Sequence, residues 1–204
     1  MKKLMVLLAA VLLSSIVLKV EAQIENSKWK LNSLTLFTGE TPLTKGITFT
    51  PIFEKGKSTF VLDLNAELGE AMYFYSVKKW FSVGPSIGFL KNTPWIGPIC
   101  SFNLFKGHFK TLNWVGWSFG DPEKGTSESL PRFLFSYHEF SLTYKNLTCY
   151  YTLQHYQEML PEHIVGAKAT FSLNENFSLF GGLGYMTRAE KYLWSVGISY
   201  KTKK

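Results

Sequence analysis

Large apolar and small side chains alternate along residues 80–90, which read WFSVGPSIGFL. One set of alternate positions holds Phe81, Val83, Pro85, Ile87 and Phe89, and the other holds Ser82, Gly84, Ser86 and Gly88. Successive side chains of a β-strand point to opposite faces of the sheet. The segment therefore predicts a strand with one bulky apolar face and one small or polar face.

The same division recurs in residues 60–68, 164–173, 177–186 and 192–201. A strand of a barrel that spans lipid carries apolar side chains outward and small or polar ones inward. A water-soluble lipocalin-type barrel reverses this arrangement and places charged residues outside. Because Gly, Ser and Thr dominate the smaller face here, the pattern favours the membrane barrel over the soluble one.

Turn signals separate these segments at regular intervals along the chain. Eleven breaks divide it into twelve segments, most of them about 8–12 residues long, and a tilted strand needs about 9–11 residues to cross a bilayer. The long breaks, 38–46, 120–131 and 157–163, are all odd-numbered, although the odd-numbered break at 68–70 is short. In an outer-membrane barrel the odd connections are the external loops. We predict an all-β fold for residues 23–204: a single up-and-down antiparallel transmembrane β-barrel of about twelve strands, with ten as the alternative.

Residues 131–144 depart from strict alternation. Phe133, Phe135 and Tyr137 occupy one set of alternate positions, whereas Phe140 and Leu142 occupy the other. A β-bulge near His138–Glu139 would restore a single apolar face. A hairpin at the same place would leave strands too short to span a bilayer, so we predict the bulge.

The first 22 residues have the features of a secretory signal peptide. Lys2 and Lys3 precede a 15-residue apolar stretch, and Val20 and Ala22 are small residues at the −3 and −1 positions. An uncleaved transmembrane anchor is the alternative, but such a helix needs about 20 residues. We therefore expect cleavage after Ala22 and a mature chain of one domain that begins at Gln23.

Composition adds an aromatic signal to this picture. The chain holds 17 Phe, 10 Tyr and 6 Trp at a net charge of +7. Aromatic rings near strand ends form the interfacial girdles of membrane barrels, and we predict the following girdle residues: Trp29, Trp80, Trp95, Tyr185, Tyr192 and Tyr200. The basic residues form no cluster with interleaved aromatics, so we expect no nucleic-acid partner.

The two cysteines, Cys100 and Cys149, occupy the same alternate positions as their apolar neighbours. We interpret both as small apolar residues on the outward face. The alternative is a disulfide between them, which requires that their strands pair.

The last strand ends at Tyr200, before the tail KTKK. In this feature, and in the alternation above, the chain resembles small bacterial outer-membrane β-barrel proteins, and its signal sequence ending in Ala-Gln is similar to those of Bacteroidota. The resemblance covers the architecture of the whole mature chain and matches no specific family. It implies export to the bacterial outer membrane and contact with outer-membrane lipid.

No motif for catalysis, metal binding or a cofactor emerges from the residue spacing. Outer-membrane phospholipases and lipid A deacylases place a Ser two residues from a His on a lipid-facing strand. None of the four histidines, His108, His138, His155 and His163, is followed by Ser at that spacing. We therefore predict no catalytic residue, no metal site and no cofactor.

The barrel interior is the remaining place for function. Alternation assigns these polar residues to the lumen: Asp63, Asn65, Glu67, Lys110, Arg132, Glu139, Tyr150, Gln154 and Lys168. Ion pairs among them would plug the barrel, whereas unpaired polar groups would line a narrow aqueous path. Strands rich in Gly and Ser leave space and favour a narrow channel for small polar solutes. An accessory or structural subunit of a larger outer-membrane protein complex is the alternative, and a lipid-modifying enzyme is the third.

Overall fold

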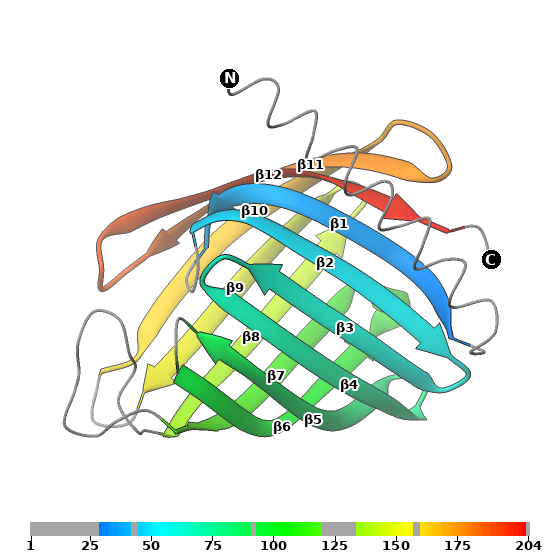
Figure 1. Ribbon diagram of the computed structural model, residues 1–204. Coiled ribbons are helices and arrows are strands. Elements are labelled where there is room, and N and C mark those ends of the chain that lie inside the picture. The colour runs from blue at the N-terminus through cyan, green and yellow to red at the C-terminus, as the bar shows by residue number, and fades with distance from the viewer. Residues whose placement is uncertain (1–28, 42–44, 91–92, 120–133, 157–159, 203–204) are drawn as a thin grey trace, which may run out of the picture.

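The computed structural model describes residues 29–41, 45–90, 93–119, 134–156 and 160–202. They form a closed barrel in which each strand pairs antiparallel with its neighbours in sequence and β1 closes on β12 (Figure 1). The strands are β1 (Lys30–Glu40), β2 (Lys45–Lys55), β3 (Ser58–Asn65), β4 (Leu68–Lys78), β5 (Phe81–Leu90), β6 (Thr93–Leu104), β7 (Phe109–Ser118), β8 (Leu134–Tyr144), β9 (Leu147–Tyr156), β10 (Glu162–Ser172), β11 (Phe177–Met186) and β12 (Lys191–Lys201). A short 3-10 helix, η1 (Phe105–Gly107), connects β6 to β7.

The twelve-stranded up-and-down topology confirms the predicted fold, and the ten-stranded alternative is wrong. Connections of two to four residues join β2–β3, β4–β5, β6–β7, β8–β9 and β10–β11. We call the end of the barrel that holds these connections the turn end, and the opposite end, which holds the β7–β8 connection, the loop end. Among the described residues, no helix is long and apolar enough to cross a membrane. The predicted signal peptide lies outside the described residues.

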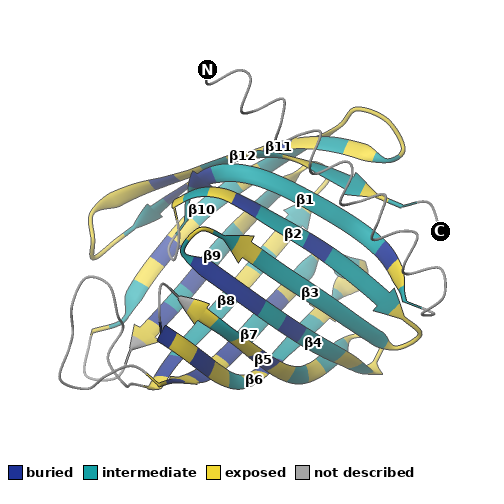
Figure 2. Cartoon of the chain, in the orientation of Figure 1, coloured by how far each residue is buried: buried dark blue, intermediate teal, exposed yellow. Residues whose placement is uncertain are grey.

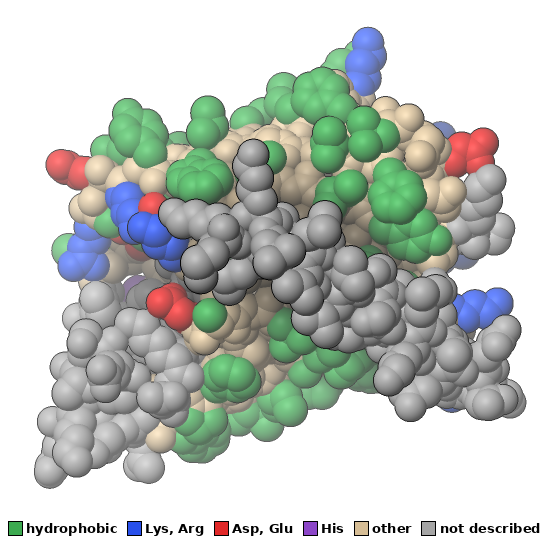
Figure 3. All heavy atoms as spheres, turned by 45° about the horizontal axis from the view of Figure 1, so that its top comes forward, with side chains coloured by type: hydrophobic (Ala, Val, Ile, Leu, Met, Phe, Trp, Pro, Cys, Tyr) green, Lys and Arg blue, Asp and Glu red, His purple; other side chains and the backbone are tan. Residues whose placement is uncertain are grey.

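On β5 the structure confirms which face carries the bulky groups. On β5, Ile87 points outward with 52% of its surface exposed, whereas Ser86 beside it is fully buried inside the barrel. The alternation gives the strands a banded pattern of burial (Figure 2). Hydrophobic side chains cover much of the outside between charged groups that lie mostly toward the ends of the view (Figure 3). Such a largely apolar surface is suited to contact with acyl chains.

Two inward glycines, Gly84 and Gly97, lie where the backbone of the neighbouring strand leaves no room for a side chain. A Cβ added to Gly84 would lie 1.8 Å from the carbonyl oxygen of Tyr73, and one added to Gly97 would lie 1.9 Å from that of Val115. Both contacts are with the backbone of the neighbouring strand, which cannot rotate away as a side chain can. Glycine at these positions therefore lets adjacent strands approach closely.

The predicted β-bulge at His138–Glu139 is wrong. β8 pairs with β7 and with β9 along its described length without a register shift. Phe135 and Tyr137 point inward, while His138 and Phe140 point outward. The sequence pattern was ambiguous because β8 has apolar groups on its inner face near the loop end and on its outer face farther along.

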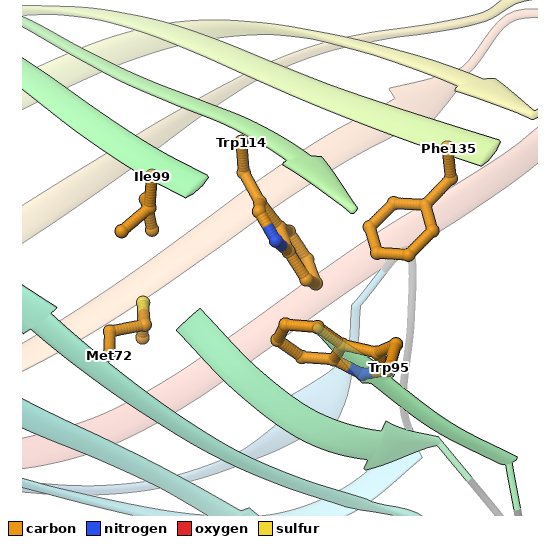
Figure 4. Close-up of a cluster of buried hydrophobic side chains, with 5 residues drawn as sticks. All are labelled: Met72, Trp95, Ile99, Trp114 and Phe135. Atoms are coloured by element: carbon orange, nitrogen blue, oxygen red, sulfur yellow. The ribbon is translucent and has the colours of Figure 1, made fainter. Parts of the chain in front are cut away.

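The inner groups of β8 belong to an apolar core inside the barrel. We call its five buried members the packed cluster: Met72, Trp95, Ile99, Trp114 and Phe135 (Figure 4). The ring centroids of Trp95 and Trp114 are 4.2 Å apart, and those of Trp114 and Phe135 are 4.7 Å apart in an edge-on arrangement. Aromatic rings prefer such tilted packing to face-to-face stacking.

The prediction that Trp95 belongs to an interfacial girdle is therefore wrong. Trp95 is 4% exposed and packs against the inward rings of β7 and β8. It shares its inward side with its register partners Gly88 and Ser118, and those small residues leave room for an indole inside the barrel.

The other predicted girdle residues lie at strand ends. Trp29 precedes β1 and Trp80 lies in the β4–β5 connection. Tyr185 and Tyr192 form an outward pair at the loop end, with centroids 5.1 Å apart, and Tyr200 forms one with Phe177 at the turn end. Their role at a membrane interface stays a prediction.

The cysteines are free and lie on strands that do not pair. Cys100 is on β6 and Cys149 on β9, and their register partners include Val83 and Leu142, which are outward and exposed. The interpretation of both as outward apolar residues is confirmed, and no disulfide joins them.

Candidate functional site: the lumen cavity

A cavity of about 490 Å³ lies inside the barrel, on the side formed by β1 and β7–β12. We call it the lumen cavity. Its wall is rich in hydroxyl groups, which belong to Thr35, Thr41, Tyr137, Ser141, Thr143, Thr148, Tyr150, Thr152, Ser195 and Ser199. Several of them bond to each other across neighbouring strands, as Thr143 and Thr148 do at 2.9 Å between their Oγ atoms. The wall can therefore exchange hydrogen bonds with water or with a polar solute.

Two lysines and one glutamate give the lumen cavity its charge. Lys110, Lys168 and Glu139 all line it. Although both lysines point inward, both are exposed, so solvent reaches the cavity. The Nζ of Lys168 also lies 5.2 Å from the ring centroid of Phe180, a distance typical of a cation–π contact.

Glu139 is held by a neighbour on its own strand. The Tyr137 hydroxyl donates a hydrogen bond of 2.9 Å to Glu139 Oε2. Alternate residues of a strand face the same side, so Tyr137 and Glu139 both point into the cavity. The hydrogen bond orients the Glu139 carboxylate, whose negative charge partly offsets the positive charge of the two lysines.

Buried apolar side chains point into the interior on β10 and β12. Ile164 on β10 and Leu193 on β12 point inward, are 0% and 3% exposed, and lie closer to the loop end than the cavity residues Lys168 and Ser195 of the same strands. Gln154 is 3% exposed in the same region, and its Nε2 has no hydrogen-bond partner among the described residues. Ile164 and Leu193 therefore take up interior space beside the cavity on β10 and β12, while Thr41, directly after β1, lines it toward the loop end.

Asp63 and Asn65, two inward polar residues of β3, do not line the cavity. Asp63 accepts a hydrogen bond from the hydroxyl of Thr50, and Asn65 donates one of 3.0 Å to Thr48 Oγ1. These inward side chains are satisfied by their neighbours on β2, so they form a wall rather than a lining for solute.

Among the predicted lumen residues, Lys110, Glu139, Tyr150 and Lys168 are brought together in the cavity. Asp63, Asn65 and Gln154 point inward elsewhere. The placement of Glu67 on the wall is wrong, because Glu67 lies in the bend between β3 and β4. Arg132 lies outside the described residues.

Glu70 is a lumen residue that the sequence did not reveal. Residues 68–70 were predicted as a break, but the turn occupies residues 66–67 and Glu70 is the register partner of Asp63. Glu70 is buried and accepts a hydrogen bond of 2.9 Å from the Ser86 hydroxyl. A two-residue turn at residues 66–67 would have paired Glu70 with the inward Asp63, and no other feature of the sequence indicated this.

Ion pairs do not plug the interior. Within the part of the chain that the structure describes, the one salt bridge joins Lys191 Nζ to Glu40 Oε1 at 2.6 Å, at the loop end. The sequence allowed an interior plugged by ion pairs or a polar aqueous path. The lumen cavity corresponds to the polar path, and the packed cluster fills the other side of the interior.

Comparison with solved structures identifies the same architecture elsewhere. The KdgM porin in complex with disordered oligogalacturonate superimposes with a TM-score of 0.54 at 13% sequence identity, over 84% of this chain and 99% of that one. The NanC porin gives a TM-score of 0.52 at 11% identity, over 84% of this chain and 100% of that one. This chain has an outer-membrane porin fold. No protein-family model and no curated protein sequence matches it.

Proposed function

We propose that this protein is a narrow channel for small polar solutes in the bacterial outer membrane. The observation that carries the proposal is the lumen cavity, in which the inward lysines Lys110 and Lys168 stay exposed to solvent. A polar, water-accessible path inside an apolar outer surface is the arrangement of a diffusion channel. The KdgM porin, which has the same fold, was solved with a polar solute, oligogalacturonate, and this supports the class of cargo.

The charge of the cavity wall suggests a weak preference for anions. Two lysines and one glutamate line it, and a confined positive potential raises the local concentration of anions. The effect is modest because Glu139 offsets part of the positive charge.

The decisive experiment measures conductance in planar bilayers after purified full-length protein is inserted. Ser195 lines the cavity, whereas its neighbour Val196 points outward with 51% of its surface exposed. Ser195→Trp is expected to lower single-channel conductance at least about twofold, because an indole occupies the path. The matched variant Val196→Trp adds the same group to the outer face and is expected to conduct as the unmodified protein does.

Two further variants test the effect of interior bulk and the selectivity. Leu193→Ala removes a buried apolar side chain from the barrel interior and is expected to raise conductance. Lys168→Glu reverses one charge in the lining and is expected to move the reversal potential in a salt gradient toward cation preference. Absence of discrete conductance steps from folded, inserted protein would rule out the channel.

A further inference from the structure

Four polar side chains interrupt the apolar outer face on β7 and β8: Thr111, Asn113, Ser136 and His138. Asn113 and His138 are register partners, and both point outward, as Ser136 does two residues before His138. Val115 and Phe140 beside them are apolar, whereas His155 on β9, the register partner of Ser136, adds a second imidazole to the outer face. Polar and ionisable groups facing the bilayer are costly and mark functional sites by default.

Hydrogen bonds hold the ring of His138 in one orientation. Asn113 Nδ2 donates to Thr111 Oγ1 at 2.9 Å, and Asn113 Oδ1 lies 3.1 Å from His138 Nδ1. Because the amide nitrogen is engaged with Thr111, the amide oxygen faces the ring and can only accept. The contact is a hydrogen bond when Nδ1 carries the proton, and in that tautomer Nε2 has a free lone pair.

Ser136 lies on the same face of the same strand as this oriented base. Alternate residues of a strand are about 7 Å apart along the chain, so Ser136 Oγ is within reach of the Nε2 side of His138 after a side-chain rotation. A serine hydroxyl beside an imidazole whose other nitrogen is held by an amide or carboxylate is the arrangement of an activated nucleophile.

The depth of Ser136 suits the ester bonds of lipids. Its register partner is Val115. The next outward pair toward the loop end, two residues along each strand, is Trp117 and Leu134. Tryptophan rings favour the headgroup level of a bilayer, and one alternate position on a tilted strand corresponds to roughly 5 Å of depth. Ser136 therefore faces the region just below the headgroups, where acyl esters lie.

We propose that Ser136 and His138 are catalytic residues of a lipid acyl-ester hydrolase on the outer face of the barrel, with Asn113 as a positioning residue. The inference is independent of the channel. Ser136 Oγ attacks the ester carbonyl carbon while His138 Nε2 takes the hydroxyl proton. The C–O bond to the alcohol breaks, and the imidazolium returns the proton to the departing lysolipid. Water then attacks the acyl-serine with His138 again as base, which releases a fatty acid and restores the serine.

The sequence pattern missed this arrangement because the search required Ser after His. On an outward strand face the order is immaterial, since residues two before and two after a histidine are equally its neighbours.

The test uses purified full-length protein in phosphatidylethanolamine vesicles, with fatty-acid release as one readout and fluorophosphonate labelling mapped by mass spectrometry as another. The probe is expected to modify Ser136. Ser136→Ala and His138→Gln are each expected to lower fatty-acid release at least about 100-fold. Asn113→Ala is expected to lower kcat with little change in KM, because the ring loses its orientation but the lipid-binding face remains.

Matched controls come from other outward residues. Ser58 is an outward serine whose register partners are Lys55 and Tyr75, and His163 is an outward histidine bonded to Tyr151 at 2.7 Å. Ser58→Ala and His163→Gln are expected to keep the full rate. Heat-modifiable migration on gels shows that each variant is folded.

Two results would overturn the proposal: an unlabelled Ser136 in the unmodified protein, or fatty-acid release that survives Ser136→Ala. If the Ser136→Ala, His138→Gln and Asn113→Ala variants instead dissociate an oligomer seen by native mass measurement, the polar cluster is a protein contact and not an esterase. Loss of conductance in Ser195→Trp tests the channel separately, because that variant alters only the inner face.

Discussion

The two sides of the barrel interior differ although their outer faces are alike. Around the packed cluster, indole and phenyl rings from β6, β7 and β8 fill the space between strands, whereas around the lumen cavity hydroxyls and two lysines leave it open to solvent. Tyr137 belongs to both, since it packs against the cluster and lines the cavity. Contact with lipid requires apolar side chains on the outward face of every strand, whereas inward side chains can be either apolar or polar.

This division suggests a division of roles. Buried aromatic and aliphatic groups stabilise the barrel by removing apolar surface from water and by close contact, and a channel wall needs the opposite, groups that remain hydrated. Placing the apolar groups on one side lets a twelve-stranded barrel have both a core and a cavity.

The largest expected effect is on the packed cluster. Trp114→Ala is expected to lower the free energy of unfolding by about 3–5 kcal/mol, because it removes the ring that contacts both Trp95 and Phe135 and leaves a cavity. Denaturant unfolding in vesicles, followed by tryptophan fluorescence and gel migration, measures it. The matched change on the open side, Ser195→Ala, is expected to change it by less than about 0.5 kcal/mol. Equal effects for the two would contradict the division.

A smaller effect is expected where backbones approach closely. Gly97→Ala places a Cβ 1.9 Å from the Val115 carbonyl oxygen, so the neighbouring strand must shift at a cost of about 1–3 kcal/mol. Gly182 lines the lumen cavity, and a Cβ there would first meet the Ser195 side chain at 3.0 Å. Gly182→Ala is expected to cost less than about 0.5 kcal/mol. A Gly97→Ala barrel as stable as the parent in the same unfolding assay would show that the strands can separate freely.

The smallest effect concerns polar groups on the two sides. Ser86→Ala removes the hydroxyl that donates to the buried carboxyl group of Glu70, which is expected to cost about 1–2 kcal/mol because that group has no water to replace it. Ser199 Oγ lies 2.9 Å from Thr35 Oγ1 on the cavity wall. There Ser199→Ala is expected to cost about 0.5 kcal/mol or less, since water replaces the bond. Paired unfolding curves distinguish the two, and a larger loss from Ser199→Ala would mean that the cavity is dry.

Much of the fold was predictable because the outward face follows a simple rule. Phe81, Val83 and Ile87 alternate with small residues, and the breaks between segments place all twelve strands. Four of the predicted lumen residues, Lys110, Glu139, Tyr150 and Lys168, do meet in one cavity.

The errors arose where the inner face is apolar as well. Trp95 and Phe135 were interpreted as outward or as signs of a bulge because the prediction assumed that bulky groups face lipid. Glu70 was missed because LGE was taken for a turn, although the strand starts at Leu68. Alternation separates two faces of a strand, but it does not say which is inner when both carry bulky groups.

The sequence by itself determined a membrane-type barrel with an apolar exterior, because lipid contact selects one kind of side chain at every second position of each strand. The tertiary structure decided which inward groups meet: Trp95 with Trp114, Lys110 with Lys168 in one cavity, and Asn113 with His138 on the outer face. These contacts depend on the register between strands and on closure of β1 against β12. Both are properties of the whole sheet that no single segment specifies.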